Sequence, residues 1–228
     1  AYLIDKMIGH RQDIIDNMIK RNCRLVVMAH NEFTTQVPEH SGMTPAKFWD
    51  RRARGLGSSR TDPVASCAEE NLLCYPGDPY NTENIMIHEF AHAIHLNGIY
   101  DVDTTFDKRL GKTYKAAMAK GLWKSKYAAN NKAEYWAEGV QSWFNTNRPP
   151  DHDHNHVDTR EELKEYDPGL AKLVGEIFGD TGWRYKRPSQ RKSPGHLQGF
   201  DPLKTPIFKW PKELNDFYLK HIREQNKK

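Results

Sequence analysis

The stretch His88-Glu89-Phe90-Ala91-His92 constrains this chain more than any other part of its sequence. Residues four apart on an α-helix lie on the same face, so His88 and His92 can direct two imidazoles at one metal ion. Glu89 then lies beside the ion rather than on it, where its carboxylate can accept a proton from a water molecule that the metal has acidified. The pattern therefore predicts a helix that carries a zinc site and a general base.

The residues around this stretch favour a helix of roughly 82–97. Asn81, Thr82, Glu83 and Asn84 supply capping side chains and an early acidic group, and an apolar run follows at 85–87. Gly98 is typical of a residue just beyond a helix end, so we expect the helix to stop there.

A catalytic zinc ion usually takes three protein ligands, so a third has to be found. In one common arrangement, a glycine at 95 and a third ligand histidine at 98 would follow the motif. Here position 95 is His95 and position 98 is Gly98, so this arrangement is excluded. The segment 131–144 instead offers Glu134 and Glu138, one helical turn apart among aromatic and alanine residues. Buried carboxylates are costly unless they are paired. We assign Glu134 as the third ligand and Glu138 as the group that orients a ligand histidine, with the reverse assignment as the alternative.

These residues resemble the gluzincin metallopeptidases, in particular the group that includes the anthrax lethal factor catalytic domain and Mlc titration factor A. The resemblance covers roughly residues 81–144. It implies that His88, His92 and Glu134 bind one Zn²⁺ ion and that Glu89 is the base. In that group a tyrosine seven residues before the ligand glutamate helps to stabilise the oxyanion, and here that position holds Tyr127.

Composition is that of an ordinary globular protein. The 228 residues are 37% hydrophobic and 28% charged, which fits one domain over 1–228 with an N-terminal lobe of about 1–98 and a C-terminal lobe of about 99–228. The 34 basic residues are interleaved with 30 acidic ones, so we expect no nucleic-acid partner. No apolar run approaches the roughly twenty residues of a membrane span.

The patterning predicts an α+β, zincin-like fold: a small mixed sheet packed on the motif helix, with a mostly helical C-terminal lobe. A helix over about 3–19 precedes the strands. Strands are expected at 23–29, 34–37, 64–67 and 71–75, and helices at 113–120, 131–145, 159–166, 168–178 and 211–225. The region 64–75 is our candidate for an edge strand that pairs with an extended substrate.

Several other residues leave alternatives open. Cys67 and Cys74 could form a disulfide if the segment between them turns back. The run 151–158 could bind a second metal ion, although a contact of His154 or His156 with substrate in the cleft is favoured. For His95 we expect a place in the core or on the substrate side rather than on the metal.

The sequence thus predicts a zinc-dependent hydrolase of peptide bonds that acts on a peptide or protein substrate. The alternatives are a binding module that retains the zinc site and a hydrolase of a non-peptide amide. The chain begins at Ala1 without an initiator methionine or a signal-peptide pattern, and we expect a secreted or periplasmic protein.

Overall fold

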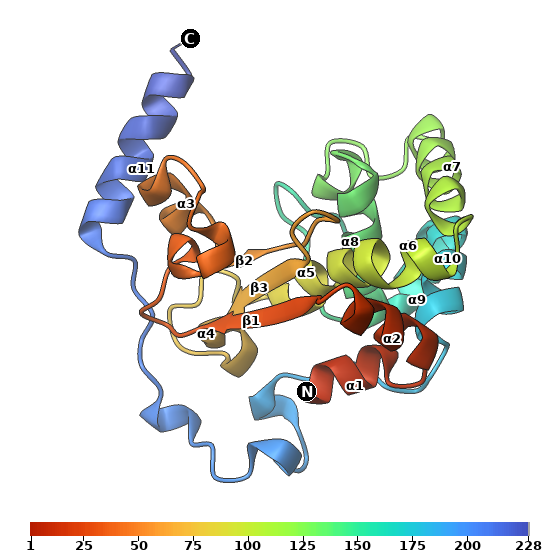
Figure 1. Cartoon of the computed structure of the whole chain (residues 1–228), viewed down its shortest axis with the longest axis horizontal. Helices are drawn as coiled ribbons and strands as arrows, with labels where there is room; N and C mark the ends of the chain where they lie inside the picture. Colours follow the sequence, from red (N-terminus) through yellow and green to blue (C-terminus); the bar gives the residue numbers. More distant parts are fainter. Residues whose placement is uncertain (228) are drawn as a thin grey trace.

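A three-stranded mixed sheet lies near the centre of the molecule (Figure 1). The computed structural model describes residues 1–227. Strand β1 (Arg24–Met28) pairs in parallel with β3 (Val64–Ala68), and β2 (Gly55–Leu56) pairs antiparallel on the other side of β3. β3 is the central strand and is buried at every position. The predicted α+β class and the strands near 23–29 and 64–67 are confirmed.

Helix α5 (Ile85–Ala93) carries the motif and packs against β3 (Figure 1). Asn84 caps it by accepting a hydrogen bond from the backbone N–H of Ile87 at 3.1 Å. The predicted stop at Gly98 is wrong: the chain continues as a π-helix, η3 (Ile94–Ile99), and then as α6 (Tyr100–Val102). Gly98 serves close packing instead, since a Cβ there would lie 2.5 Å from Cγ2 of Ile14.

The other short elements of the N-terminal lobe differ from the expectation. The N-terminal helix is two helices, α1 (Tyr2–Ile8) and α2 (Gln12–Lys20). The expected strand at 34–37 is a 3₁₀ turn, η1 (Thr34–Gln36), followed by η2 (Pro38–His40) and α3 (Ala46–Arg52). The expected strand at 71–75 is wrong as well, because the chain forms α4 (Glu69–Leu73) there.

Asn71 accounts for the helical path of α4. Its amide donates to Oδ2 of Asp78 at 2.9 Å and to the carbonyl of Glu83 at 3.0 Å, and its carbonyl oxygen accepts from the N–H of Ile85 at 2.8 Å. These side-chain bonds tie α4 to the start of α5. The edge strand beside the motif helix is therefore β2, not the region 64–75.

The C-terminal lobe is helical and contains no strand between residues 99 and 227. Its elements are α7 (Phe106–Ala119), η4 (Tyr127–Ala129), α8 (Lys132–Trp143), α9 (Arg160–Tyr166) and α10 (Pro168–Phe178). α8 packs against α5, and its tryptophan Trp136 stacks on Phe178 of α10 with ring centroids 5.8 Å apart. One hydrophobic core includes buried residues of both lobes, from Met7 to Tyr185.

The last part of the chain returns to the N-terminal lobe. Residues from about 180 to 211, with η5 (Pro188–Gln190), η6 (Gly195–Leu197) and η7 (Pro202–Lys204), run along the outside (Figure 1). They lead to α11 (Lys212–Gln225), where Tyr218 stacks on Phe48 of α3 at 5.5 Å. The helix expected at 211–225 is confirmed, and it packs on α3.

The structure answers whether the two cysteines that flank α4 form a disulfide. Cys67, buried in β3, and Cys74, at the end of α4, are both free, so no disulfide joins them. Within residues 1–227 no helix combines the length and the apolar character that a membrane crossing requires.

Candidate metal centre and cleft

Three side chains from two helices converge between α5 and α8. His88 and His92 lie one turn apart on α5, and Glu134 lies in the first turn of α8, where Asn131 caps the helix through the N–H groups of Ala133 and Glu134. Oε2 of Glu134 is 3.0 Å from Nε2 of His88 and 3.6 Å from Nε2 of His92. The structure thus brings together the three residues that the sequence assigned as ligands.

Their spacing suits a metal ion. Two ligand atoms bound at about 2.0–2.1 Å to a tetrahedral ion lie about 3.3–3.4 Å apart. The distances from Glu134 to His88 and His92 fall on either side of this value, and one ligand atom from each residue lies within 4.8 Å of the others. His88, His92 and Glu134 could therefore hold a metal ion after shifts of a few tenths of an ångström.

The charges around these donors favour a cation. Burial alone would lower the pKa of His88, but Glu134, Glu89 and Glu138 outweigh it and raise that pKa to about 10. Burial would raise the pKa of Glu134, yet hydrogen bonds from His88 and His92 hold it well below its usual range. These glutamates concentrate negative charge around His88. A proton on His88 neutralises only part of that charge, so the site favours a divalent cation.

A glutamine fixes the orientation of His88. Oε1 of Gln141 lies 2.7 Å from Nδ1 of His88, which assigns the proton to Nδ1 and leaves Nε2 facing Glu134 and the ion position. Glu138, expected in this role, lies farther from Nδ1, at 3.5 Å, and accepts a hydrogen bond from Asn147 at 3.0 Å. Gln141 was not predicted from the sequence, although it follows Glu134 by seven residues on the same face of α8.

Gln141 is itself held in a buried chain of polar contacts. Its amide donates to Oε2 of Glu83 at 3.0 Å, and Oε1 of Glu83 accepts from Nε of Arg148 at 2.9 Å. Because each polar group in this series has a partner, the hydrogen bonds fix the amide orientation of Gln141 and, through it, the orientation of the His88 ring.

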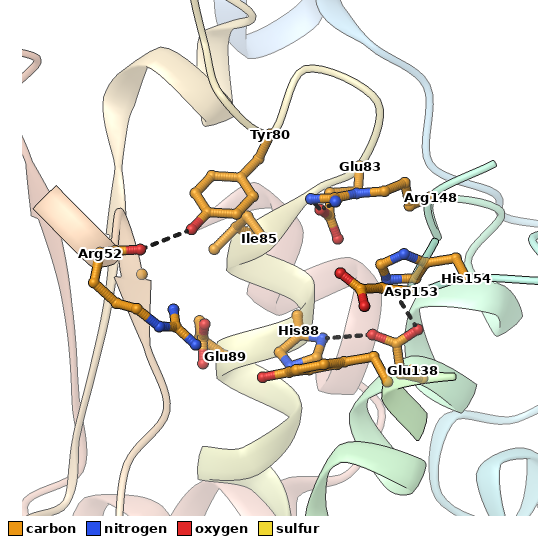
Figure 2. A pocket seen from close by; sticks show the side chains of 12 residues that line it. Arg52, Tyr80, Glu83, Ile85, His88, Glu89, Glu138, Arg148, Asp153 and His154 are labelled. Carbon is orange, nitrogen blue, oxygen red and sulfur yellow. Dashed lines mark hydrogen bonds and ion pairs between the residues drawn. The ribbon is translucent and has the colours of Figure 1, made fainter. Parts of the chain in front are cut away.

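A cleft of about 260 Å³ opens in front of His88 (Figure 2). Glu89 lines it beside His88, and Tyr127 lines it from the start of η4, just before α8, as the sequence led us to expect. The rings of Tyr127 and His88 have centroids 6.2 Å apart. Burial, followed by the charges of Glu134 and Glu89, raises the pKa of Tyr127 well above its usual value, so its phenol keeps the proton and can donate it in a hydrogen bond.

Two glycines allow β2 to lie directly on the motif helix. A Cβ at Gly55 would be 2.3 Å from Cγ2 of Ile85, and one at Gly57 would be 2.6 Å from Cδ2 of His92. Any larger residue would push the strand away from α5. Gly55 lines the cleft, so the edge strand runs along one wall of it.

The remaining histidines take separate places. His154 lines the cleft and His156 packs edge-on against Tyr166, so of these two only His154 is placed for substrate. Burial lowers the pKa of His95 to about 4, and its ring packs against Phe106 and Trp136, which makes it a core residue as expected. Among residues 1–227, the run 151–158 does not bring three ligand side chains together as His88, His92 and Glu134 do.

Comparisons of the chain with protein-family models, with curated proteins and with solved structures give no significant match. The gluzincin family therefore stays a prediction from the motif. Function has to be inferred from the geometry of the cleft.

Proposed function

We propose that this protein is a zinc-dependent hydrolase of peptide bonds with a zincin-like fold. One observation carries the proposal: two imidazoles and a carboxylate converge to metal-ligand spacing, and one of them, His88, lines a cleft that Glu89 and Tyr127 also line. A purely structural metal site would be closed on all sides by protein ligands and would need neither of these two groups.

Zinc suits this set of donors. Two imidazole nitrogens and one carboxylate oxygen are a common set for catalytic zinc, in which a fourth position stays open. When bound, the ion would polarise a substrate carbonyl and lower the pKa of a water molecule toward about 7.

The protein groups account for the proton transfers. Glu89 accepts a proton from the attacking water as its oxygen bonds to the carbonyl carbon. The same carboxyl group then delivers the proton to the amine nitrogen as the C–N bond breaks. Tyr127 donates a hydrogen bond to the carbonyl oxygen, which gains negative charge only as the reaction proceeds, so its contribution falls mainly on the transition state.

The edge strand supports an extended peptide as substrate. β2 pairs with β3 through one edge only, which leaves its other edge for backbone hydrogen bonds with a second chain. The proposed substrate-binding strand is therefore Gly55–Leu56 instead of the region 64–75. A secreted or periplasmic location also stays a proposal.

The test is the Glu89→Gln variant of the zinc-loaded protein. It should keep its metal and its fold but lose turnover of a peptide library by on the order of 10²–10⁴-fold, because it removes the base and no ligand. Glu165→Gln, an exposed glutamate on α9, is the matched control and should cleave like the wild type. Loss of zinc from Glu89→Gln would instead make Glu89 a ligand.

Chelation separates the proposal from its alternatives. Cleavage that stops with a chelator and returns with zinc supports the peptidase. Bound zinc without cleavage of any peptide would favour a binding module, and turnover restricted to small non-peptide amides would favour the other hydrolase.

A further inference from the structure

The two walls of the cleft carry different charges. Glu138, Asp153 and His154 line the wall formed by α8 and the loop after it. Figure 2 shows Arg52 and Tyr80 on the opposite side of His88 and Glu89. His88, one of the three candidate ligands, lies between the walls with Glu89, so a substrate over these two residues would contact both walls.

Arg52 is the cleft arginine whose charge is not neutralised. Arg148 donates to Glu83 and pairs with Asp151 at 3.4 Å. The guanidinium of Arg52, in contrast, makes no hydrogen bond and no ion pair with any residue in 1–227, and Glu89, toward which it points in Figure 2, is not within ion-pair distance.

The backbone beneath Arg52 is nevertheless held in place. The carbonyl of Arg52 accepts a hydrogen bond from the hydroxyl of Tyr80 at 3.3 Å. The next carbonyl, that of Ala53, accepts from Oγ1 of Thr34 at 2.8 Å, and the side chain of Arg54 is completely buried against Glu70. The backbone at this position therefore needs no ordering when a ligand arrives, and only the rotamer freedom of the Arg52 side chain is lost.

Arg52 also acts electrostatically on the residues that line the cleft. Burial raises the pKa of Tyr80 and of Tyr127, and the positive charge of Arg52 opposes the rise at both phenols. The charge of Arg52 therefore acts on Tyr127, near His88, as well as on its neighbour Tyr80.

We propose that Arg52 binds a carboxylate of the substrate, and so selects peptides that carry an acidic side chain or a free C-terminus close to the scissile bond. The inference rests on the proposed function and adds a substrate class to it. A guanidinium presents parallel N–H donors that match the two oxygens of a carboxylate, which an amide or a hydroxyl does not reproduce.

Binding to the zinc-loaded Glu89→Gln protein tests this without turnover. The probes are short fluorescent peptides of one sequence in three forms: a neutral form with an interior Gln and an amidated C-terminus, a form with Glu in place of Gln, and a form with a free C-terminal carboxylate. We expect one of the acidic forms to bind about 5–10-fold more tightly than the neutral one, and which one does so identifies the source of the carboxylate.

Variants of Arg52 decide whether this residue is responsible. Adding Arg52→Gln to the Glu89→Gln protein should make the dissociation constants of the three peptide forms equal. Arg52→Lys should keep part of the preference for the acidic form, because it keeps the charge but not the planar pair of donors. The unfolding midpoint should stay unchanged, since the guanidinium has no partner to lose. Arg223→Gln, an exposed arginine on α11, removes the same charge away from the cleft and should keep the full preference.

The outcomes separate this inference from the proposed function. Equal binding of all forms, no binding of any form, or a preference that survives Arg52→Gln would overturn the role of Arg52. Failure of the wild-type protein to cleave any of the peptides would count against the hydrolase, while a carboxylate preference lost in Arg52→Gln would still stand as a property of the cleft.

Discussion

Two buried charged clusters of this protein differ in whether their charges are balanced. Arg54 and Glu70 have fully buried side chains, and the guanidinium donates to both carboxylate oxygens and to the carbonyls of Ala29 and Glu32. At the candidate metal centre, Glu89, Glu134 and Glu138 instead surround the imidazoles of His88 and His92, and the cluster opens onto the cleft.

The difference separates a structural role from a functional one. The pair of Arg54 and Glu70 neutralises itself, so it has no capacity left for a ligand, and its cost of desolvation is offset within the fold. The candidate metal centre has an excess of acceptors and of negative charge, which a bound cation could balance. Burial of charge is thus a weak indicator of function, and unbalanced charge at a cleft is a stronger one.

The largest effect should follow from loss of a ligand. Glu134→Ala should lower the zinc affinity by more than the roughly 100-fold that changes around a ligand cause, because it removes one of three protein bonds to the ion. Zinc titration of the purified variant measures this, and unfolding in the presence of chelator should be close to that of the wild type. A smaller loss than in Glu138→Ala would reverse the roles of the two glutamates.

The structural pair should respond in the opposite way. Arg54→Met leaves Glu70 buried without its partner and should lower the free energy of unfolding by about 3–5 kcal/mol in urea titrations. Zinc bound per folded molecule should stay that of the wild type. The matched control is Lys212→Ala, which removes an exposed ion pair with Asp216 and should cost less than about 1 kcal/mol. An equally small effect at Arg54 would contradict the comparison.

The metal centre could be predicted from sequence because its parts are local. The four-residue spacing of His88 and His92, the caps Asn84 and Asn131, and the first-turn position of Glu134 each depend on one helix. Helical periodicity and capping chemistry determine such features without knowledge of the fold.

The other wall of the cleft depends on contacts between distant segments, and the sequence did not predict it. Arg52, Gly55 and Tyr80 meet in the cleft only because β2 pairs with β3 and α4 is tied to α5 through Asn71. The error at 71–75 has the same origin, since a short apolar run fits a strand or a helix equally well until its side-chain partners are known.

Tyr127 lines the cleft near His88 but is not a metal ligand in the proposed mechanism. Tyr127→Phe should keep zinc and KM near the wild-type values while kcat falls by on the order of 10²–10³-fold, because only the hydroxyl donor is lost. Steady-state kinetics on one cleavable peptide measure this. Tyr100→Phe, an exposed tyrosine on α6 that does not line the cleft, is the control. An unchanged kcat in Tyr127→Phe would make Tyr127 a packing residue.

The smallest effect concerns the groups that orient His88. Gln141 is the nearer acceptor for Nδ1 of His88, so Gln141→Leu should weaken zinc binding by about 10–100-fold, the range for groups that orient a ligand. It should also lower stability, because Glu83 loses the amide that donates to it.

Glu138→Gln distinguishes orientation from charge. Its oxygen can still accept the hydrogen bond from Asn147, so the fold should tolerate the change, but one negative charge beside the ion is gone. If the Gln141 bond orients His88, Glu138→Gln should weaken zinc binding less than Gln141→Leu. A larger loss in Glu138→Gln would mean that the surplus of negative charge, rather than the orientation of His88, dominates the affinity of this centre.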